Sequence, residues 1–174
     1  MIQRFTFGCP LPTESVVLPV EPAAAAVPYL TAEPDGSWSF SLAEDAVVYG
    51  LGEMPRGINK RGWHYVTDNT DESRHGENRL SYYGAHNFLL IDGGAGRSIF
   101  GVFVDFPGKV FYDIGYTRHD RLTFRTEEPD YDLYILTGDS PNAVCTEFRK
   151  LIGHSYIPPK WAFGFAQSRW GYQN

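Results

Sequence analysis

Cysteine and long apolar runs are scarce in this sequence. The chain has 174 residues but only two cysteines, Cys9 and Cys145, which are too few for a disulfide framework. No apolar run approaches the roughly 20 residues that a membrane-spanning helix needs. The residues after Met1, IQRFTFGCPLP, lack the long apolar centre of a signal peptide. We therefore expect a cytoplasmic protein with no membrane partner, held together by its own core.

Positive charge and metal-ligand spacing are also lacking. With 15 Lys and Arg against 21 Asp and Glu the formal net charge is −6, whereas nucleic-acid binders need basic clusters for the phosphates. The glycine-rich stretch 92–98 has no lysine before its serine, so it predicts a hairpin turn and not a phosphate loop. Neither an H-x-x-x-H pattern nor zinc-type cysteine spacing accompanies the five histidines, His64, His75, His86, His119 and His154. We expect no nucleic acid, metal or other cofactor.

Turn-forming and aromatic residues, by contrast, are abundant. The 18 Gly, 12 Pro, 11 Tyr and 12 Phe favour an all-β domain with many turns. Residues 2–7 and 37–42 alternate like half-buried strands, and Trp38, Phe40 and Leu42 would face the core. Further strands are expected at residues 16–20, 47–51, 88–91, 98–105, 110–114, 122–126 and 132–136. Short strands at this spacing predict an antiparallel β-sandwich.

One helix is expected near the end of the chain. Ser140 suits the N-cap, Pro141 suits the first helical position, and Gly153 suits the end. The apolar residues that recur at helical spacing between them are Val144, Phe148, Leu151 and Ile152. Cys145 is adjacent to this stripe and is predicted to be a small core residue.

The stretch 53–83 loses all periodicity and is rich in charge. A segment this long without regular structure inside a compact domain indicates a functional loop. Its aromatic residues are Trp63, Tyr65, Tyr82 and Tyr83. Their flat rings either form platforms for the faces of sugars or pin the loop to the sandwich, and the sequence leaves both readings open.

The final stretch, 157–174, reads IPPKWAFGFAQSRWGYQN. Its two prolines end the preceding element, and the apolar run 161–166 predicts a strand buried on both faces, as in parallel sheets. Such a strand needs neighbouring strands that no remaining residues supply. We therefore expect two parts: a sandwich domain over residues 1–153, and residues 154–174 as a linker and the start of a truncated second domain.

Several stretches of this chain resemble glycoside hydrolase family 31, the α-glucosidases and their relatives. In the family's order they are YGLGE (49–53), NTD (69–71), YGAHNF (83–88), FGVF (100–103), DLYILTG (132–138) and PPKWAFGFAQSRWGY (158–172). The resemblance implies a galactose-mutarotase-like sandwich followed by the first strand of a catalytic (β/α)8 barrel. It implies a retaining enzyme that releases terminal α-linked glucose from oligosaccharides through a covalent intermediate. The two catalytic aspartates would lie downstream of Asn174, so this chain alone would be inactive.

The same resemblance gives the loop an auxiliary role at the mouth of the barrel. Asp71, with Thr70 beside it, matches the position that hydrogen-bonds sugar hydroxyls, and a carboxylate accepts such bonds well. The alternative is that Asp71 merely caps a turn. Trp63, Arg169 and Trp170 are expected beside the pocket, in supporting and not catalytic positions.

Two other functions fit the sequence. The first is a free-standing carbohydrate-binding module, built on Trp63 or Tyr82 and neighbouring acids. The second is a structural or assembly domain, because Trp161, Phe163 and Phe165 would be exposed without the barrel, and exposed apolar patches find partners. The expected partners are thus an α-glucoside oligosaccharide, the missing barrel, and a second copy of the chain in a homo-oligomer.

Overall fold

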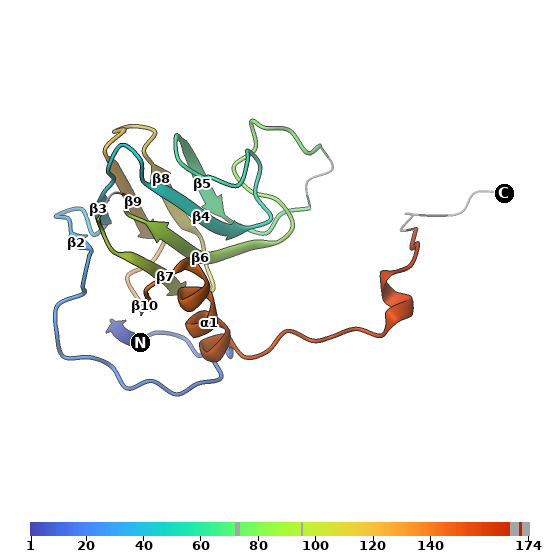
Figure 1. Cartoon of the computed structure of the whole chain (residues 1–174), viewed down its shortest axis with the longest axis horizontal. Coiled ribbons are helices and arrows are strands. Elements are labelled where there is room, and N and C mark those ends of the chain that lie inside the picture. The colour runs from blue at the N-terminus through green and yellow to red at the C-terminus, as the bar shows by residue number, and fades with distance from the viewer. Residues whose placement is uncertain (72–73, 95, 168–170, 172–174) are drawn as a thin grey trace.

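The computed structural model describes residues 1–71, 74–94, 96–167 and 171, and shows two antiparallel sheets packed face to face (Figure 1). The first sheet has the strand order β1-β10-β7-β6-β4, and the second has the order β2-β3-β9-β8-β5. The strands are β1 (Ile2–Phe7), β2 (Thr31–Ala32), β3 (Trp38–Ser41), β4 (Val47–Gly52), β5 (Trp63–Thr67), β6 (Ala85–Asp92), β7 (Ile99–Asp105), β8 (Val110–Ile114), β9 (Arg121–Thr126) and β10 (Tyr131–Thr137). Helix α1 (Pro141–Ile152) and a 3₁₀ turn η1 (Lys160–Phe163) follow. The predicted antiparallel β-sandwich with one C-terminal helix is confirmed.

Alternation along the strands of the second sheet separates its core face from its outer face. On β8 and β9, Tyr112 and Leu122 are buried between the sheets. Asp113 and Thr123 are directly opposite each other and only partly buried. Trp38 and Phe40 pack against the core from β3, as their alternation predicts. The second sheet therefore has one apolar face and one polar face.

The first sheet is covered on both faces. Strands β7 and β10 are buried along nearly their whole length because α1 packs on their outer side. The ring of Phe148 on α1 stacks on Phe88, with centroids 3.9 Å apart. The predicted cap is confirmed, since the Ser140 hydroxyl accepts a hydrogen bond from the Ala143 N–H. Cys145 is exposed, so its predicted place in the core is wrong, because it lies outside the buried stripe.

A backbone irregularity ends β4. Gly50, Leu51 and Gly52 have successive positive φ values of 122°, 65° and 72°, and the pairing with β6 shifts register there. A Cβ at Gly50 would lie 2.1 Å from the Phe88 carbonyl oxygen, so only glycine fits. Leucine rarely adopts this conformation, but Leu51 is fully buried and its packing holds it there. This bulge turns the chain out of the sheet into the stretch that follows.

Two strand predictions differ from the structure. Residues 16–20 form no strand. Instead the Val17 and Leu18 amides both donate to the Leu151 carbonyl at the end of α1, within a proline-rich path. Conversely, β5 lies inside the stretch predicted to be an irregular loop. Its five residues, WHYVT, do not alternate regularly between apolar and polar, because Val66 follows Tyr65 and the buried Thr67 is polar, so they do not stand out between charged neighbours.

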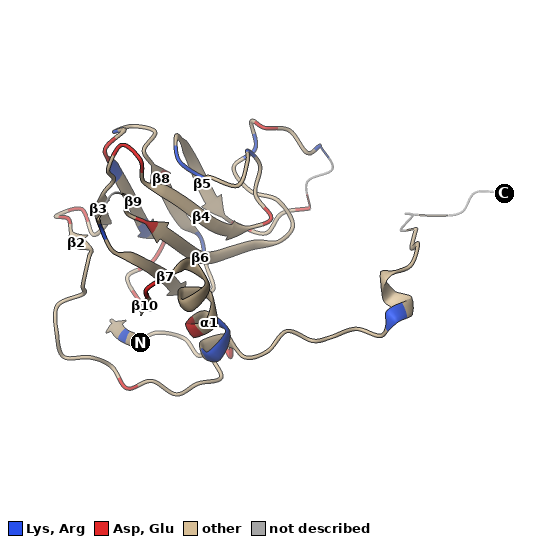
Figure 2. Ribbon diagram, viewed as in Figure 1, with Lys and Arg blue, Asp and Glu red and all other residues tan. Residues whose placement is uncertain are grey.

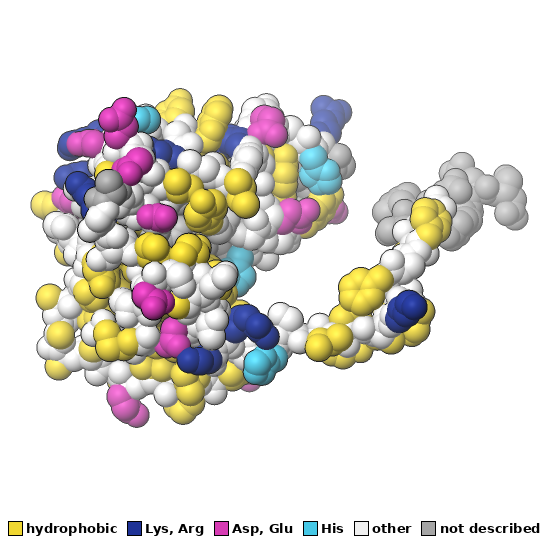
Figure 3. Space-filling model, in the orientation of Figure 1, with side chains coloured by type: hydrophobic (Ala, Val, Ile, Leu, Met, Phe, Trp, Pro, Cys, Tyr) yellow, Lys and Arg dark blue, Asp and Glu magenta, His cyan; other side chains and the backbone are white. Residues whose placement is uncertain are grey.

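The segment after α1 extends away from the sandwich (Figure 1). The predicted strand at 161–166 is wrong for the described residues, which form η1 and an extended tail. A lone strand would leave its backbone groups unpaired, whereas the 3₁₀ turn pairs the Ala162 N–H with the Pro159 carbonyl at 2.9 Å. Figure 3 shows the apolar side chains along this segment, and the exposed ones are Tyr156, Ile157, Trp161, Phe163 and Phe165.

Candidate functional site

The segment of residues 68–84 links the edge strand β5 of the second sheet to β6 of the first (Figure 1). Its two arms are tied together at the base, because the Thr70 N–H donates to the Tyr82 carbonyl at 3.1 Å. The Asn69 side chain accepts a hydrogen bond from the Ala85 N–H at 2.6 Å, where β6 begins. The loop therefore projects from the sandwich on a fixed base.

The predicted sugar-contacting residues lie just beyond this base. Thr70 and Asp71 are both exposed. The Asp71 carboxylate makes no hydrogen bond or ion pair with any other residue that the structure describes, and so it caps no turn formed by them. An exposed carboxylate beside a hydroxyl can accept and donate hydrogen bonds to a polyhydroxylated ligand.

A polar hollow of about 440 Å³ adjoins the start of this loop at Asp68 and Asn69. It is lined by Thr67, Asp68, Asn69, Ala85, Asn87, Phe106, Pro107, Gly108, Lys109 and Glu127. Asn87 donates to the Phe106 carbonyl at 3.3 Å, but its buried Oδ1 has no partner among the described residues. The Lys109 ammonium lies 3.0 Å from the Asp68 carboxylate, which raises the pKa of Lys109 above its ordinary value. The hollow thus offers an amide, carboxylates and an ammonium group close to Thr70.

Trp63 is not brought together with Thr70 and Asp71. It begins β5, whereas the loop follows the other end of that strand. The Arg56 guanidinium lies 4.4 Å from the centre of the Trp63 ring, and it also donates to the Glu77 carbonyl at 2.8 Å. Of the two readings of the loop aromatics, this contact supports pinning of the loop.

Lys60 organises the stretch that precedes β5, although nothing in the sequence distinguishes it from the other charged residues of the loop. Its side chain is 5% exposed, and its ammonium lies 3.0 Å from the Gly57 carbonyl oxygen. Three more carbonyl oxygens lie at 3.4 Å, those of Met54, Pro55 and Arg56. Burial lowers the pKa of Lys60. We call the carbonyls of residues 54–57 the carbonyl cage.

Arg169 and Trp170 lie outside the described residues. Among the residues that are described, no three His, Cys, Asp or Glu side chains gather closely enough to hold a metal ion. Cys9 and Cys145 are both exposed free thiols. No helix in the described part of the chain is both long and apolar enough to cross a membrane.

Comparison with known families decides what this sandwich is. Residues 26–113 match the profile of the glycosyl hydrolase 31 N-terminal galactose mutarotase-like domain. The chain belongs to this family. The resemblance found in the sequence motifs is thereby confirmed, and the family 31 domain accounts for the ten-stranded sandwich.

The curated relatives of this family 31 domain are glycosidases, and their names refer to different sugars. The chain is 33% identical over 137 residues to alpha-glucosidase 2 of Bacillus thermoamyloliquefaciens, covering 77% of this chain and 17% of that protein. It is 32% identical over 124 residues to alpha-xylosidase XylQ of Lactiplantibacillus pentosus, covering 71% and 15%. The chain therefore spans less than a fifth of the length of these relatives.

A solved structure shows the same fold. The family 31 dextranase of Flavobacterium johnsoniae, complexed with glucose, superposes with a TM-score of 0.66 and 25% sequence identity. The match covers 81% of this chain and 17% of the dextranase. The similarity in both sequence and structure thus extends well beyond the matched profile region.

Proposed function

We propose that this family 31 domain is the non-catalytic N-terminal part of a retaining α-glucosidase, which releases terminal α-linked glucose from oligosaccharides. The observation that carries the proposal is the match of residues 26–113 to this domain family, together with relatives that are far longer glycosidases. The catalytic aspartates would belong to a barrel outside these residues. The domain would brace that barrel and lend it a loop, and the cytoplasmic location predicted from the sequence belongs to the same proposal.

The contribution of the loop rests on Asp71 and Thr70. Their exposure, on a base fixed by Asn69 and Tyr82, supports contact with sugar hydroxyls at the mouth of the barrel. A hydrogen bond from a hydroxyl to a charged acceptor contributes about 1.5–3 kcal/mol. Losing Asp71 should therefore weaken substrate binding without touching the reacting atoms.

The tail supplies the contact with the barrel in this proposal. Trp161 and Phe165 are 81% and 96% exposed, which is unusual for rings of this size and supports a packing partner. Residues 154–174 would be the linker and the first barrel segment. Arg169 and Trp170 would then lie near the substrate pocket.

Kinetics on the enzyme that includes the barrel tests the proposal. Asp71→Asn is expected to raise KM for maltose about tenfold, with kcat changing less, while the matched exposed change Glu128→Gln leaves both unchanged. The 174-residue chain alone is expected to hydrolyse no α-glucoside. Turnover by the isolated chain would overturn the non-catalytic role, and an unchanged KM in Asp71→Asn would overturn the role of the loop.

A further inference from the structure

The outer face of the second sheet is open in the part of the chain that the structure describes. Helix α1 packs on β6, β7 and β10 of the first sheet, and no helix packs on β3, β9, β8 or β5 (Figure 1). A sheet face left open to solvent is ordinarily polar and featureless. This one instead carries an ordered set of hydrogen-bonding groups.

Four of these groups form a row across four neighbouring strands. In the register of the sheet, Ser39 on β3 is opposite Thr123 on β9, Thr123 is opposite Asp113 on β8, and Asp113 is opposite His64 on β5. Opposed side chains on one face lie about 4.5–5.5 Å apart at their Cβ atoms. Ser39 is itself buried and donates to Glu33, so the row presents the Thr123 hydroxyl, the Asp113 carboxylate and the His64 imidazole on three neighbouring strands.

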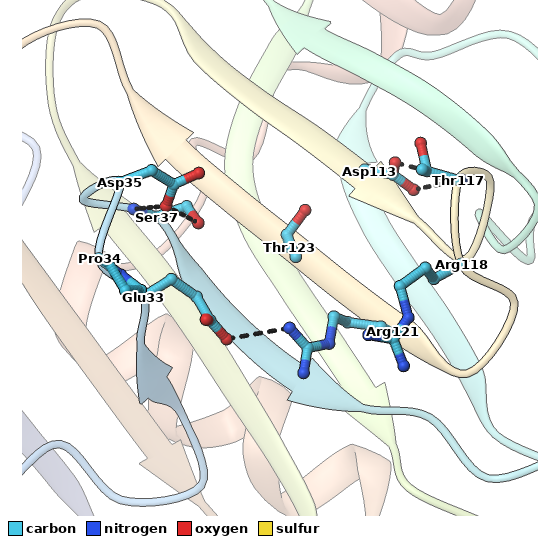
Figure 4. A pocket seen from close by; sticks show the side chains of 9 residues that line it. All are labelled: Glu33, Pro34, Asp35, Ser37, Asp113, Thr117, Arg118, Arg121 and Thr123. Carbon is cyan, nitrogen blue, oxygen red and sulfur yellow. Dashed lines mark hydrogen bonds and ion pairs between the residues drawn. The ribbon is translucent and has the colours of Figure 1, made fainter.

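Two members of the row, Asp113 and Thr123, line a hollow of about 440 Å³ (Figure 4). In Figure 4 the Thr123 side chain lies between the turn that carries Asp35 and the strand end that carries Asp113. A second hollow of about 620 Å³ adjoins it, because Asp35, Ser37, Asp113 and Thr123 line both. Small-ligand sites typically measure about 300–1,000 Å³. We call the two adjoining hollows the trough.

Two of the three arginines that line the two hollows are each paired with a carboxylate. The Glu33 carboxylate accepts from Ser39 at 2.5 Å and from Arg121 at 3.1 Å. The Arg118 guanidinium binds Asp120 at 3.1 Å. Acidic and basic residues are interspersed over the whole sandwich (Figure 2). An anion site needs an excess of positive charge, and this face has none.

Several donors and acceptors are held in place before any ligand arrives. Asp113 accepts from the Tyr116 N–H at 2.9 Å and, through both oxygens, from the Thr117 N–H at 3.2 Å, which fixes the carboxylate. The Arg125 guanidinium lies 4.3 Å from the centre of the Phe111 ring, so a flat surface flanks the row. The Thr123 hydroxyl, at the centre, makes no hydrogen bond to another described residue. The face is therefore preorganised, with its central group left for a ligand.

We propose that the trough on the outer face of the second sheet binds a neutral oligosaccharide. A sugar hydroxyl both donates and accepts, and this face offers fixed groups of each kind without net positive charge. The site is separate from the loop that carries Thr70 and Asp71, so the inference goes beyond the proposed function. It would give the domain a second binding site for a substrate chain.

Titration of the ¹⁵N-labelled 174-residue chain with maltotriose and with isomaltotriose tests this. Saturable amide shifts are expected on β3, β8 and β9, including Asp113 and Thr123. Thr123→Val removes the central hydroxyl at nearly constant volume and is expected to weaken binding at least fivefold. Thr146→Val, an equivalent change at an exposed position on α1, is expected to leave it unchanged.

Three results with the unaltered chain would overturn the inference. They are the absence of saturable shifts with either trisaccharide, shifts confined to the loop of residues 68–84, and inorganic phosphate binding at the trough in place of sugar. Binding that is lost in Asp71→Asn but kept in Thr123→Val also rejects this trough while supporting the loop. Failure here leaves the kinetics of the barrel-containing enzyme untouched, so the two proposals fail independently.

Discussion

At the scale of single residues, Lys60 is the group on which the stretch before β5 depends. Replacing it as Lys60→Met keeps the side-chain length but leaves the carbonyl cage without its donor. Unsatisfied buried acceptors are costly, and we expect the free energy of unfolding to fall by about 2 kcal/mol. Urea denaturation of both proteins measures this.

Lys109→Met is the matched control for Lys60. The Lys109 side chain is 44% exposed and its partner is a surface carboxylate, so its loss should lower the stability far less than the loss of Lys60 does. Equal stability of Lys60→Met and the unaltered chain would show that water replaces the ammonium in the carbonyl cage. Amide exchange at residues 53–62 should rise in Lys60→Met only.

Tyr134 predicts a loss of stability in alkali. Burial raises its pKa to about 12 in the folded protein, against an ordinary value of 10.0. The unfolded chain therefore releases this proton first, so stability is intact below pH 10 and declines as the pH rises toward 12. The full contribution is at most about 3 kcal/mol.

Substitution isolates that contribution. Tyr134→Phe should make the decline of the unfolding free energy above pH 10 shallower in urea titrations. Part of the decline should remain, because burial also raises the pKa of Tyr65, Tyr112 and Tyr131. Tyr116→Phe removes an exposed phenol and should leave the slope unchanged. An identical slope in Tyr134→Phe would mean that Tyr134 titrates alike in both states.

Whether the role of a residue can be predicted from the sequence depends on how that residue acts. Asp71 and Thr70 stay predictions, which rest on a motif of the family resemblance and on their exposure in the loop. Lys60 and Asn87 could not be found that way. Lys60 acts through carbonyl oxygens, which carry no sequence signature, and Asn87 matters because folding buries its Oδ1 beside a hollow.

At the scale of elements, the cap of α1 is a measurable contribution. Ser140→Ala removes the acceptor for the Ala143 N–H and should lower stability by about 1 kcal/mol. Ser140→Asp should restore it, because aspartate caps as well and suits the positive end of the helix. Ser155→Ala, at an exposed position beyond the helix, is the neutral reference for thermal melts. Equal melting of Ser140→Ala would show that packing of Phe148 and Leu151 alone fixes the helix.

Elements were predictable where their pattern was long or bounded by clear signals. Helix α1 has both a cap and a stripe, and β8 to β10 are short strands separated by turn residues. Strand β5 was missed because its five residues stand between charged stretches. The strand predicted for residues 161–166 is wrong for another reason. Its residues do favour a buried strand, but strand formation requires neighbours that this chain does not provide.

At the scale of the whole molecule, the tail governs association. The exposed side chains of Trp161, Phe163 and Phe165 predict that the isolated chain self-associates into homo-oligomers as its concentration rises. Static light scattering should show an apparent mass that increases with concentration. The double variant Trp161→Ser with Phe165→Ser should abolish the increase. Leu11→Ser, which removes a leucine that is 69% exposed elsewhere, should not. A strictly monomeric chain at every concentration would contradict this.

The unequal covering of the two sheets leaves an attachment point away from the open face. Cys145 is exposed on α1, the helix that packs on the first sheet, whereas the trough is on the outer side of the second. In a Cys9→Ser variant, a fluorophore or a tether coupled to Cys145 would be attached on the helix-covered side of the first sheet. An immobilised array oriented in this way would offer every copy's trough to sugars in solution.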